Sequence, residues 1–381
     1  MDNSITIEKD FNILSDEVSK EICITSNSTI KEINFHITDY CEGHCPMCYA
    51  TDEKMIRKHG NIETLKLVVH NAIAYGRVGR FVMVGGDPCE HPNLVELLRY
   101  IKQEGKKYGI DTKSMVISNT HEYKENGEKI NIEDISDYLD GVCLTVHGHT
   151  SDIHDKFNGC LGSYNKVMEN LRRYAKVKKK EQEICIIVNL MPSTIEHLWD
   201  IINNTNNELN GKIDSIAIQR IAPIGKACGT NKYFIDTKDV NKILKTFKDV
   251  QEKYGFYLEF VDAFPWCIVK QEYRDLLHKG GCNWGTDYCA VFSDGSVSRC
   301  AMSENKLSMN MTQLDSREKF ENFWKYDKEL TRFRKKEHLD EKCKNCDLLN
   351  DCGGGCALAR VTGDPYKYKE IEKGHDYLIK R

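Results

Sequence analysis

Short apolar runs alternate with longer amphipathic segments between residues 31 and 225. The apolar runs are INFHIT, FVMVGG, SMVISN, GVCLTVHG, ICIIVNLM and SIAIQRI. The segments between them include NLVELLRYIKQEGKKYG and SYNKVMENLRRYAKVKK, whose apolar residues recur at spacings of three and four, the period of an α-helix. Repeated strand-helix units with right-handed crossovers build a parallel sheet. We therefore expect an α/β fold, a partial TIM-like (β/α)6 barrel with its functional face at the carboxyl ends of the strands.

The pattern changes after this region. Residues 236–256 predict one more amphipathic helix, and from residue 257 the strands become short, Gly and Asp interrupt them, and cysteines become frequent. A loop-rich domain of this kind needs crosslinks or metal sites to fold. The expected organisation is a lead-in over 1–30, the barrel over 31–235, a linking helix over 236–256 and a cysteine-rich domain over 257–381.

Composition narrows the class of protein. Hydrophobic residues make up 40 % of the 381 and charged residues 29 %, and the formal net charge of −4 gives no basic surface for nucleic acid. The sequence shows neither a signal peptide nor an apolar stretch long enough to span a membrane, so we expect a cytoplasmic protein without a membrane partner. Seventeen cysteines in such a chain favour metal binding over disulfides.

Three of these cysteines follow the first predicted strand. Cys41, Cys45 and Cys48, the cysteine triplet, have the spacing C-x3-C-x2-C. A disulfide uses two thiols and a tetrahedral zinc site four, so three is an unusual number for either. The triplet resembles that of the radical S-adenosylmethionine (radical SAM) superfamily, in which three thiolates hold a 4Fe-4S cluster and one iron is left for the amino and carboxylate groups of S-adenosyl-L-methionine. The alternative is a degenerate zinc knuckle.

Motifs at later strand ends extend the resemblance. VGGDP (84–88) stands where the family carries a Gly-Gly-Glu-Pro turn, with Asp87 in place of Glu, and ISNT (117–120) and LTVHG (144–148) end the next two strands. Met47 replaces the aromatic residue that relatives carry before the third cysteine, and Tyr49 offers a substitute surface beside the adenine. The resemblance implies these cofactor-binding residues: Tyr49, Gly85, Gly86, Asp87, Ser118, Asn119 and Thr145.

Other polar residues near these motifs indicate a function less clearly. The histidines of HGHTSDIHDKF (147–157) suggest a separate metal site, but loop hydrogen bonds and helix capping are the expected roles of His147, His149 and His154. A further set of charged residues either lines the cavity or forms ordinary surface ion pairs: Asp87, Asp152, Asp155, Arg220 and Asp262.

A second cysteine array lies in the C-terminal region. Its spacings are C282-x6-C289-x10-C300, with Gly295-x4-Cys300 inside, and C343-x2-C346-x5-C352-x3-C356. The array resembles the SPASM extension of radical SAM enzymes that modify peptides and proteins. The resemblance implies one auxiliary 4Fe-4S cluster on Cys282, Cys289, Cys300 and Cys356, and a second one on Cys343, Cys346 and Cys352.

The fourth ligand of the second auxiliary cluster is left open. The family pattern ends with a further downstream cysteine, and no cysteine follows Cys356. His375, Asp376, water or substrate are the alternatives, and one or two structural zinc sites are the competing interpretation of the whole array. The remaining cysteines are expected to act as small apolar residues, with Cys89, Cys160, Cys228 and Cys267 as alternative hydrogen-atom donors.

The resemblance implies an enzyme that reductively cleaves S-adenosyl-L-methionine to a 5'-deoxyadenosyl radical, which abstracts a hydrogen atom from a ribosomally made peptide. The outcome would be a thioether or carbon-carbon crosslink, oxidation or epimerisation. Expected partners are the peptide or protein substrate, a flavodoxin- or ferredoxin-type electron donor and a separate leader-binding protein, because a first strand near residue 33 leaves little room for a winged-helix leader-recognition domain. An anaerobic sulfatase-maturing enzyme and a non-catalytic iron-sulfur or zinc scaffold are the alternatives. The sequence does not identify a catalytic general base.

Overall fold

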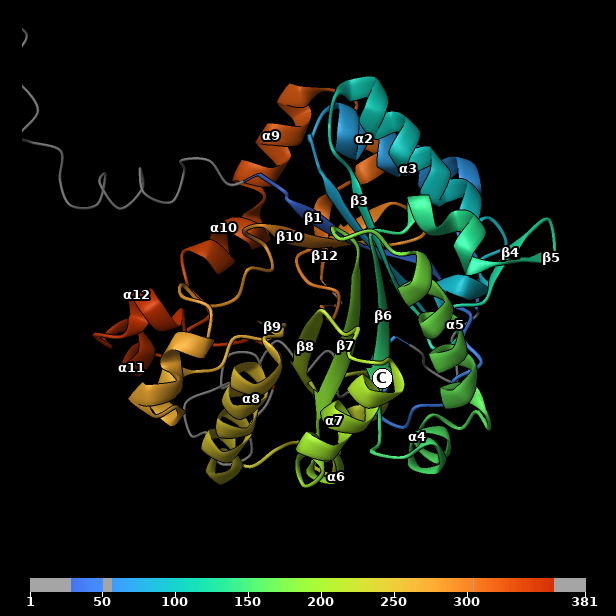
Figure 1. The fold of residues 1–381 in the computed structure, drawn as a ribbon. Coiled ribbons are helices and arrows are strands. Elements are labelled where there is room, and N and C mark those ends of the chain that lie inside the picture. Colours follow the sequence, from blue (N-terminus) through green and yellow to red (C-terminus); the bar gives the residue numbers. More distant parts are fainter. Residues whose placement is uncertain (1–28, 51–56, 304, 360–381) are drawn as a thin grey trace, which may run out of the picture.

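A curved sheet of ten strands organises the part of the chain that the structure describes. The computed structural model describes residues 29–50, 57–303 and 305–359. The strands follow the order β12-β11-β10-β1-β2-β3-β6-β7-β8-β9, and the neighbours from β10 to β9 are parallel (Figure 1). Two short strands, β4 and β5, form a separate hairpin. This arrangement confirms the predicted α/β class and the partial barrel.

The strands of the main sheet are short, as is usual for a barrel wall. They are β1 (Glu32–Thr38), β2 (Arg80–Gly85), β3 (Lys113–Ile117), β6 (Gly141–Val146), β7 (Glu183–Leu190), β8 (Ser215–Arg220), β9 (Tyr257–Phe260), β10 (Tyr288–Val291), β11 (Ser296–Ser298) and β12 (Lys306–Asn310). The hairpin strands are β4 (Tyr123–Glu125) and β5 (Glu128–Ile130).

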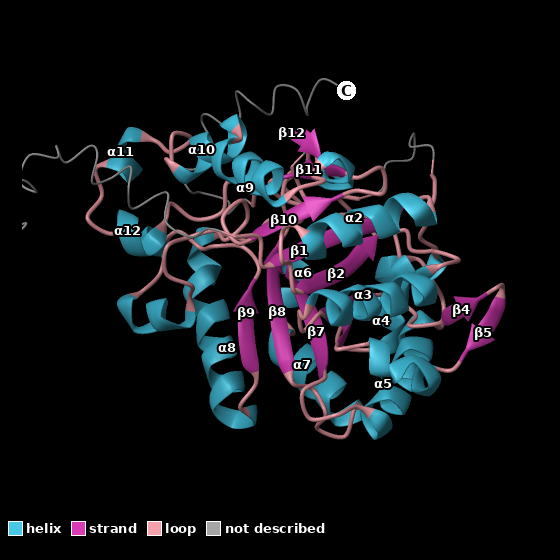
Figure 2. Cartoon of the chain, turned by 90° about the horizontal axis from the view of Figure 1, so that it is seen from above, coloured by secondary structure: helices cyan, strands magenta, loops and turns pink. Residues whose placement is uncertain are grey.

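Helices cover the outer face of the sheet, as Figure 2 shows. They are α2 (Ile62–Ala74), α3 (Leu94–Tyr108), α4 (Ser151–Asn158), α5 (Ser163–Val177), α6 (Pro192–Ile195), α7 (Leu198–Glu208) and α8 (Val240–Tyr254). Four more follow the last strands: α9 (Arg317–Tyr326), α10 (Lys328–Arg334), α11 (Glu341–Lys344) and α12 (Leu349–Cys352). Short 3-10 turns join several elements, among them η1 (Pro88–Glu90) and η5 (Trp266–Ile268).

Alternation along the strands separates the helix-packed core from the barrel interior. In β2, Phe81 and Met83 belong to the main core beneath the helices, whereas Val82 and Val84 belong to a smaller cluster that faces inward. Successive side chains of a strand point to opposite faces, so a strand buried on both sides needs this nearly continuous apolar sequence. Apolar residues at helical spacing complete the outer core, as in α8 with Ile243, Leu244 and Phe247.

All six predicted strands are present, and four further strands extend the sheet beyond them. β9 adds a parallel strand after β8, and β10 pairs in parallel with β1 at the other edge. The sheet therefore continues past residue 257, where the sequence predicts a domain boundary. The predicted domain limits stay predictions, and the two predicted domains share one sheet.

Within the described residues, no helix has the length and apolar character needed to cross a membrane.

Candidate active site and iron-sulfur sites

The cysteine triplet lies on the loop that leaves the carboxyl end of β1. Backbone hydrogen bonds fix this loop from three sides. Gly86 N donates to Thr38 O at 2.7 Å, His44 N to Asn158 O at 2.6 Å and Lys226 N to Cys48 O at 3.0 Å. The ends of β2 and α4 and the 3-10 turn η3 (Gly225–Ala227) therefore position the three thiols, although the loop itself has little regular structure.

The glycines at the end of β2 allow the cysteine loop to approach closely. A Cβ on Gly86 would lie 2.1 Å from Tyr40 O, and one on Gly85 would lie 2.2 Å from Thr38 O. Gly85 also has φ +143°, a value that side chains rarely permit. The structure thus gives the Gly-Gly pair a packing role, because any side chain there would displace the loop that carries the triplet.

The thiols of the triplet are largely buried and receive hydrogen-bond donors. Gly43 N donates to Cys41 Sγ at 3.2 Å, Asn119 Nδ2 lies 3.8 Å from the same sulfur, and His147 Nε2 lies 3.7 Å from Cys45 Sγ. Burial, with smaller contributions from Asp87 at Cys41 and from neighbouring thiols, raises the pKa of Cys41 and of Cys45 to about 12. Three adjacent thiolates would therefore need a bound cation to balance their charge, as an iron-sulfur cluster does.

A cavity opens directly above the triplet and collects most of the predicted cofactor-binding residues. Its lining includes the three cysteines together with Tyr49, Gly85, Gly86, Ser118, Asn119 and Thr145. These residues come from the ends of β1, β2, β3 and β6, as expected for a parallel barrel. The placement fits a site for S-adenosyl-L-methionine beside the triplet, while the individual contacts to the cofactor stay predictions.

Asp87 is the exception among these residues. Its side chain is 3 % exposed and does not line the cavity above the triplet. It accepts hydrogen bonds from Cys89 N at 3.0 Å, Asn119 N at 2.9 Å and Ser118 Oγ at 3.0 Å. Burial raises its pKa, and these hydrogen bonds oppose the rise. Asp87 thus braces the Ser118–Asn119 loop from behind, and its predicted contact with the cofactor stays a prediction.

Two of the histidines expected to form loop hydrogen bonds, His147 and His154, bind each other. His147 N donates to His154 Nδ1 at 3.2 Å, and both rings are buried. Burial lowers the pKa of His147 to about 3, so its ring is neutral beside Cys45. His149 stacks near His197, with ring centroids 4.0 Å apart. The described residues contain no group of three or more His, Cys, Asp or Glu side chains arranged to hold a single metal ion.

Arg220, at the end of β8, is the most informative of the charged cavity candidates. Its side chain is 0 % exposed and its guanidinium lies 4.3 Å from the ring centroid of Phe264. Nη2 donates to Ala263 O at 2.7 Å, but Nε and Nη1 have no hydrogen-bond partner. Asp262 Oδ2 lies 3.9 Å from Nε, and Arg220 lines the cavity above the triplet, so its Nη1 is a hydrogen-bond donor available to an anionic group of a ligand.

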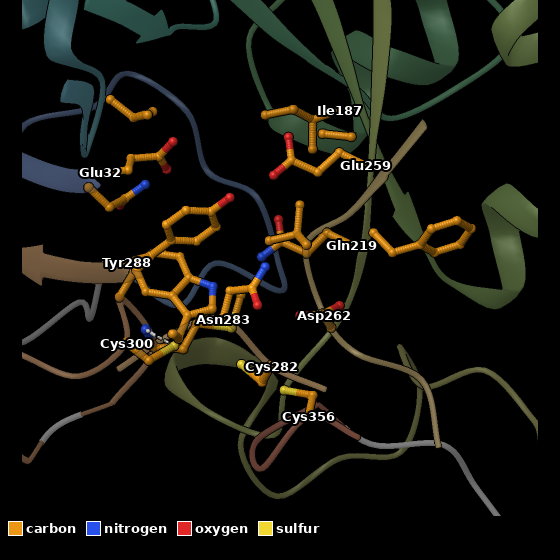
Figure 3. A pocket seen from close by; sticks show the side chains of 18 of the residues that line it. Glu32, Ile187, Gln219, Glu259, Asp262, Cys282, Asn283, Tyr288, Cys300 and Cys356 are labelled. Atoms are coloured by element: carbon orange, nitrogen blue, oxygen red, sulfur yellow. Dashed lines mark hydrogen bonds between the residues drawn. The ribbon is translucent and has the colours of Figure 1, made fainter. Parts of the chain in front are cut away.

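A second cavity occupies the barrel interior and reaches the cysteine-rich region. Six residues line both cavities, so the two adjoin: Tyr49, Val84, Ile117, Ile187, Gln219 and Met302. Figure 3 shows Cys282, Cys300 and Cys356 at one side of this interior and Glu32, Gln219 and Glu259 across from them. We call Cys282, Cys300 and Cys356 auxiliary site I.

Auxiliary site I has the donor set of an iron-sulfur site. Cys300 Sγ accepts from Met302 N at 3.4 Å, and Cys356 Sγ accepts from Leu358 N at 3.3 Å and Ala359 N at 3.2 Å. Such amides stabilise negative charge on sulfur and tune cluster potentials. Burial raises the pKa of Cys300 to about 12, with a further rise from Cys356. As at the triplet, neighbouring buried thiols that accept backbone amides fit a cluster.

Cys289, the fourth predicted ligand of the same cluster, lies apart from these three cysteines, and its role as a ligand stays a prediction. It lies within β10, is 0 % exposed and packs in the main core. The preceding residue, Tyr288, lines the cavity, so alternation along the strand turns Cys289 to the opposite face. Burial and Glu32 raise its pKa, without a contribution from another thiol. The spacing C-x6-C does not indicate which face of the strand carries Cys289. The alternation of the strand sequence YCAV does.

The C-terminal string Cys343, Cys346 and Cys352 forms a third thiol group, apart from the cavity. α11 carries Cys343, Cys346 N donates to Cys343 O at 3.1 Å, and Cys352 ends α12. Cys352 Sγ accepts from Trp266 N at 3.3 Å. His375 and Asp376, the predicted alternative ligands, lie outside the described residues. The alternative hydrogen-atom donors Cys89, Cys160, Cys228 and Cys267 line neither of the two adjoining cavities.

Comparison with protein-family models gives two matches. A model of the radical SAM superfamily matches residues 35–204, and the SPASM model, an iron-sulfur cluster-binding domain, matches residues 282–347. The chain carries a radical SAM domain followed by a SPASM domain. Its cofactors are S-adenosyl-L-methionine, the radical SAM 4Fe-4S cluster and auxiliary 4Fe-4S clusters of the SPASM domain. The assignment of individual cysteines to these clusters stays a prediction.

Known radical SAM proteins show how wide the range of substrates is. The AdoMet-dependent heme synthase of Oleidesulfovibrio alaskensis is 22 % identical, over 72 % of this chain and 69 % of its own. The PqqA peptide cyclase of Ruegeria pomeroyi is 24 % identical, over 86 % of this chain and 83 % of its own. The crystal structure of Streptococcus suis SuiB bound to its precursor peptide SuiA matches with a TM-score of 0.64 at 16 % identity, covering 89 % of this chain and 74 % of that one. At this identity the structural match establishes the fold.

Proposed function

We propose that this radical SAM enzyme modifies a ribosomally made peptide, installing a crosslink, an oxidation or an inverted stereocentre. When bound, the cluster and S-adenosyl-L-methionine supply a 5'-deoxyadenosyl radical that removes a hydrogen atom from the substrate. The observation that carries the proposal is a pair of adjoining cavities, one above the triplet and one beside auxiliary site I, which share six lining residues. A substrate side chain can enter this space while the rest of a polypeptide stays outside the barrel.

The walls of the cavity favour controlled radical chemistry. The inward-facing cluster contains Val82, Val84, Met115, Ile187 and Ala217, all buried. Apolar walls exclude water and limit the positions that a bound side chain can adopt. The protein contribution is therefore to hold one carbon of the substrate near the cofactor and to keep solvent away from it.

The similarity to peptide-modifying proteins supports the same class. The PqqA peptide cyclase is named for a peptide substrate, and SuiB was crystallised with a precursor peptide. A sulfatase-maturing activity would also act on a polypeptide and needs the same cavity. A non-catalytic scaffold has no need of the Gly85–Gly86 packing that positions the triplet under an open cavity.

The test is an anaerobic incubation of the reconstituted protein with S-adenosyl-L-methionine, dithionite and short peptides encoded next to its gene. We expect loss of hydrogen from one peptide, or deuterium incorporation in heavy water, detected by mass spectrometry and absent in the Cys41→Ala, Cys45→Ala, Cys48→Ala triple variant. Parallel incubation with a carboxylated tetrapyrrole is the matched comparison. Turnover of the tetrapyrrole, without modification of any peptide, would overturn the proposal.

A further inference from the structure

The C-terminal string Cys343, Cys346 and Cys352 lies beside a cysteine from an earlier part of the chain. The SPASM resemblance predicts a fourth thiolate after Cys356, and the sequence has none there. Cys267 is a candidate that the fold places beside the string. It lies in η5 (Trp266–Ile268), and its residue is exposed at the surface rather than packed in the core.

Backbone contacts hold the segment of Cys267 against the end of the string. Cys356 N donates to Ala263 O at 2.7 Å, and Trp266 N donates to Cys352 Sγ at 3.3 Å. Residues 263–266 therefore run alongside 352–356, and Cys267 directly follows the amide that touches the Cys352 sulfur. The amide itself is the kind of donor that surrounds cluster sulfurs at the other two sites.

Neighbouring contacts keep η5 in this position. Asn241 Nδ2 donates to Ile268 O at 3.1 Å, and Arg274 Nη2 donates to Trp266 O at 3.3 Å. Both side chains bind the backbone on either side of Cys267, so they restrict where its thiol can lie. The position of Cys267 is thus set by the fold, although its side chain is exposed.

We propose that Cys267 is the fourth protein ligand of the second auxiliary cluster, together with Cys343, Cys346 and Cys352. We call these four residues auxiliary site II. On coordination the Cys267 thiol releases its proton to solvent and binds iron as a thiolate. The family places the fourth ligand after the string, whereas Cys267 precedes the cysteines of auxiliary site I in the sequence. Neither His375 nor Asp376 is then needed as a ligand.

This assignment gives the two auxiliary sites different chemical capacities. Site II has four cysteine thiolates and lies outside the cavity, which suits electron relay between the barrel and an external donor. Site I has three cysteines among the described residues and lines the cavity. The inference rests on the auxiliary clusters and does not depend on which substrate the enzyme takes.

The first test measures thiol protection in the wild-type protein. Apo and cluster-loaded protein are alkylated anaerobically with iodoacetamide, and labelled peptides are quantified by mass spectrometry. We expect Cys267 to be labelled in the apo protein and protected at least about 10-fold after reconstitution, in parallel with Cys346. Cys228 serves as the control thiol, with equal labelling in both states. Equal labelling of Cys267 with and without clusters, while Cys346 is protected, would overturn the assignment.

The second test uses iron counting to separate site II from site I. In a Cys282→Ala, Cys300→Ala, Cys356→Ala background, adding Cys267→Ala should lower iron from about eight to about four per chain and remove one cluster from the EPR and Mössbauer spectra. In a Cys343→Ala, Cys346→Ala, Cys352→Ala background, the same substitution should leave the iron content unchanged. Iron loss in the second background instead of the first would place Cys267 at site I and refute the proposal. None of these measurements uses catalytic activity.

Discussion

Ser118 Oγ donates a hydrogen bond of 3.0 Å to Asp87 Oδ2, joining two residues that lie 31 positions apart in the sequence. The same carboxylate oxygen accepts from Asn119 N at 2.9 Å. Asp87 follows β2 and Ser118 follows β3, so this pair fixes the ends of adjacent parallel strands at the face where S-adenosyl-L-methionine binds. The acidic residue of the Gly-Gly-Asp-Pro turn thereby shapes the site without lining it.

Replacing Asp87 should weaken cofactor binding through this loop. Asp87→Ala leaves three buried donors unpaired, which costs about 1–3 kcal/mol of folding free energy for each unsatisfied group that water cannot reach. We expect the Kd for S-adenosyl-L-methionine to rise about 10-fold and the thermal midpoint to fall. Equilibrium dialysis and thermal unfolding measure the two effects. The control is Glu90→Gln on η1, and unchanged cofactor affinity in Asp87→Ala would contradict the bracing role.

Gly86 should tolerate no side chain. In Gly86→Ala the new methyl group would meet Tyr40 O at 2.1 Å, so the loop that carries the triplet must move. We expect the variant to lose most of its 5'-deoxyadenosine formation while the iron at both auxiliary sites is retained. Gly79→Ala is the matched control, because its Cβ would meet nothing nearer than Asp111 O at 3.5 Å. Full activity of Gly86→Ala would show that the loop has another way to accommodate a methyl group.

Cys289 and Cys282 should behave oppositely, although both belong to the predicted ligand set of one cluster. Cys289→Ala removes a buried core sulfur and should cost about 1 kcal/mol of stability without loss of iron. Cys282→Ala should lower the iron content and change the EPR signal of auxiliary site I. Iron determination on both variants shows which of the two cysteines is a cluster ligand. Loss of iron in Cys289→Ala would show that Cys289 is a ligand, as the spacing predicts.

The contrast between these cysteines shows what the sequence can predict. INFHIT followed by C-x3-C-x2-C places the triplet at the end of a strand, because apolar strands and ligand-bearing loops leave a local pattern. The sequence gives no such local pattern for the surroundings of Cys289 and Cys267, because the tertiary fold decides which thiols come together. The pairing of β10 with β1 turns Cys289 into the core, and the contact between Trp266 N and Cys352 Sγ brings Cys267 to the string across 86 positions.

Glu32 should make stability depend on pH near neutrality. Burial raises its pKa from 4.5 to about 7, although Arg80 Nε at 3.0 Å opposes the rise. The folded protein then keeps a proton that the unfolded chain has released, so the free energy of unfolding falls as pH rises through this window. The slope approaches about 1.4 kcal/mol per pH unit below the folded pKa.

Glu32→Gln should remove this contribution. Between pH 6 and 8, chemical unfolding of the cluster-loaded protein should show a loss of stability in the wild type that is about 1 kcal/mol larger than in the variant. Glu128→Gln, at an exposed position of β5, is the control and should follow the wild type. Parallel stability curves for wild type and Glu32→Gln would refute the raised pKa.

The most direct test of radical chemistry at the triplet is to measure 5'-deoxyadenosine release from the protein reconstituted anaerobically with iron and sulfide. With dithionite and S-adenosyl-L-methionine, the wild type should carry about twelve irons and release 5'-deoxyadenosine. The Cys41→Ala, Cys45→Ala, Cys48→Ala variant should keep about eight irons and release none. No release from a fully loaded wild type, or equal release from the variant, would contradict the placement of radical chemistry at the triplet.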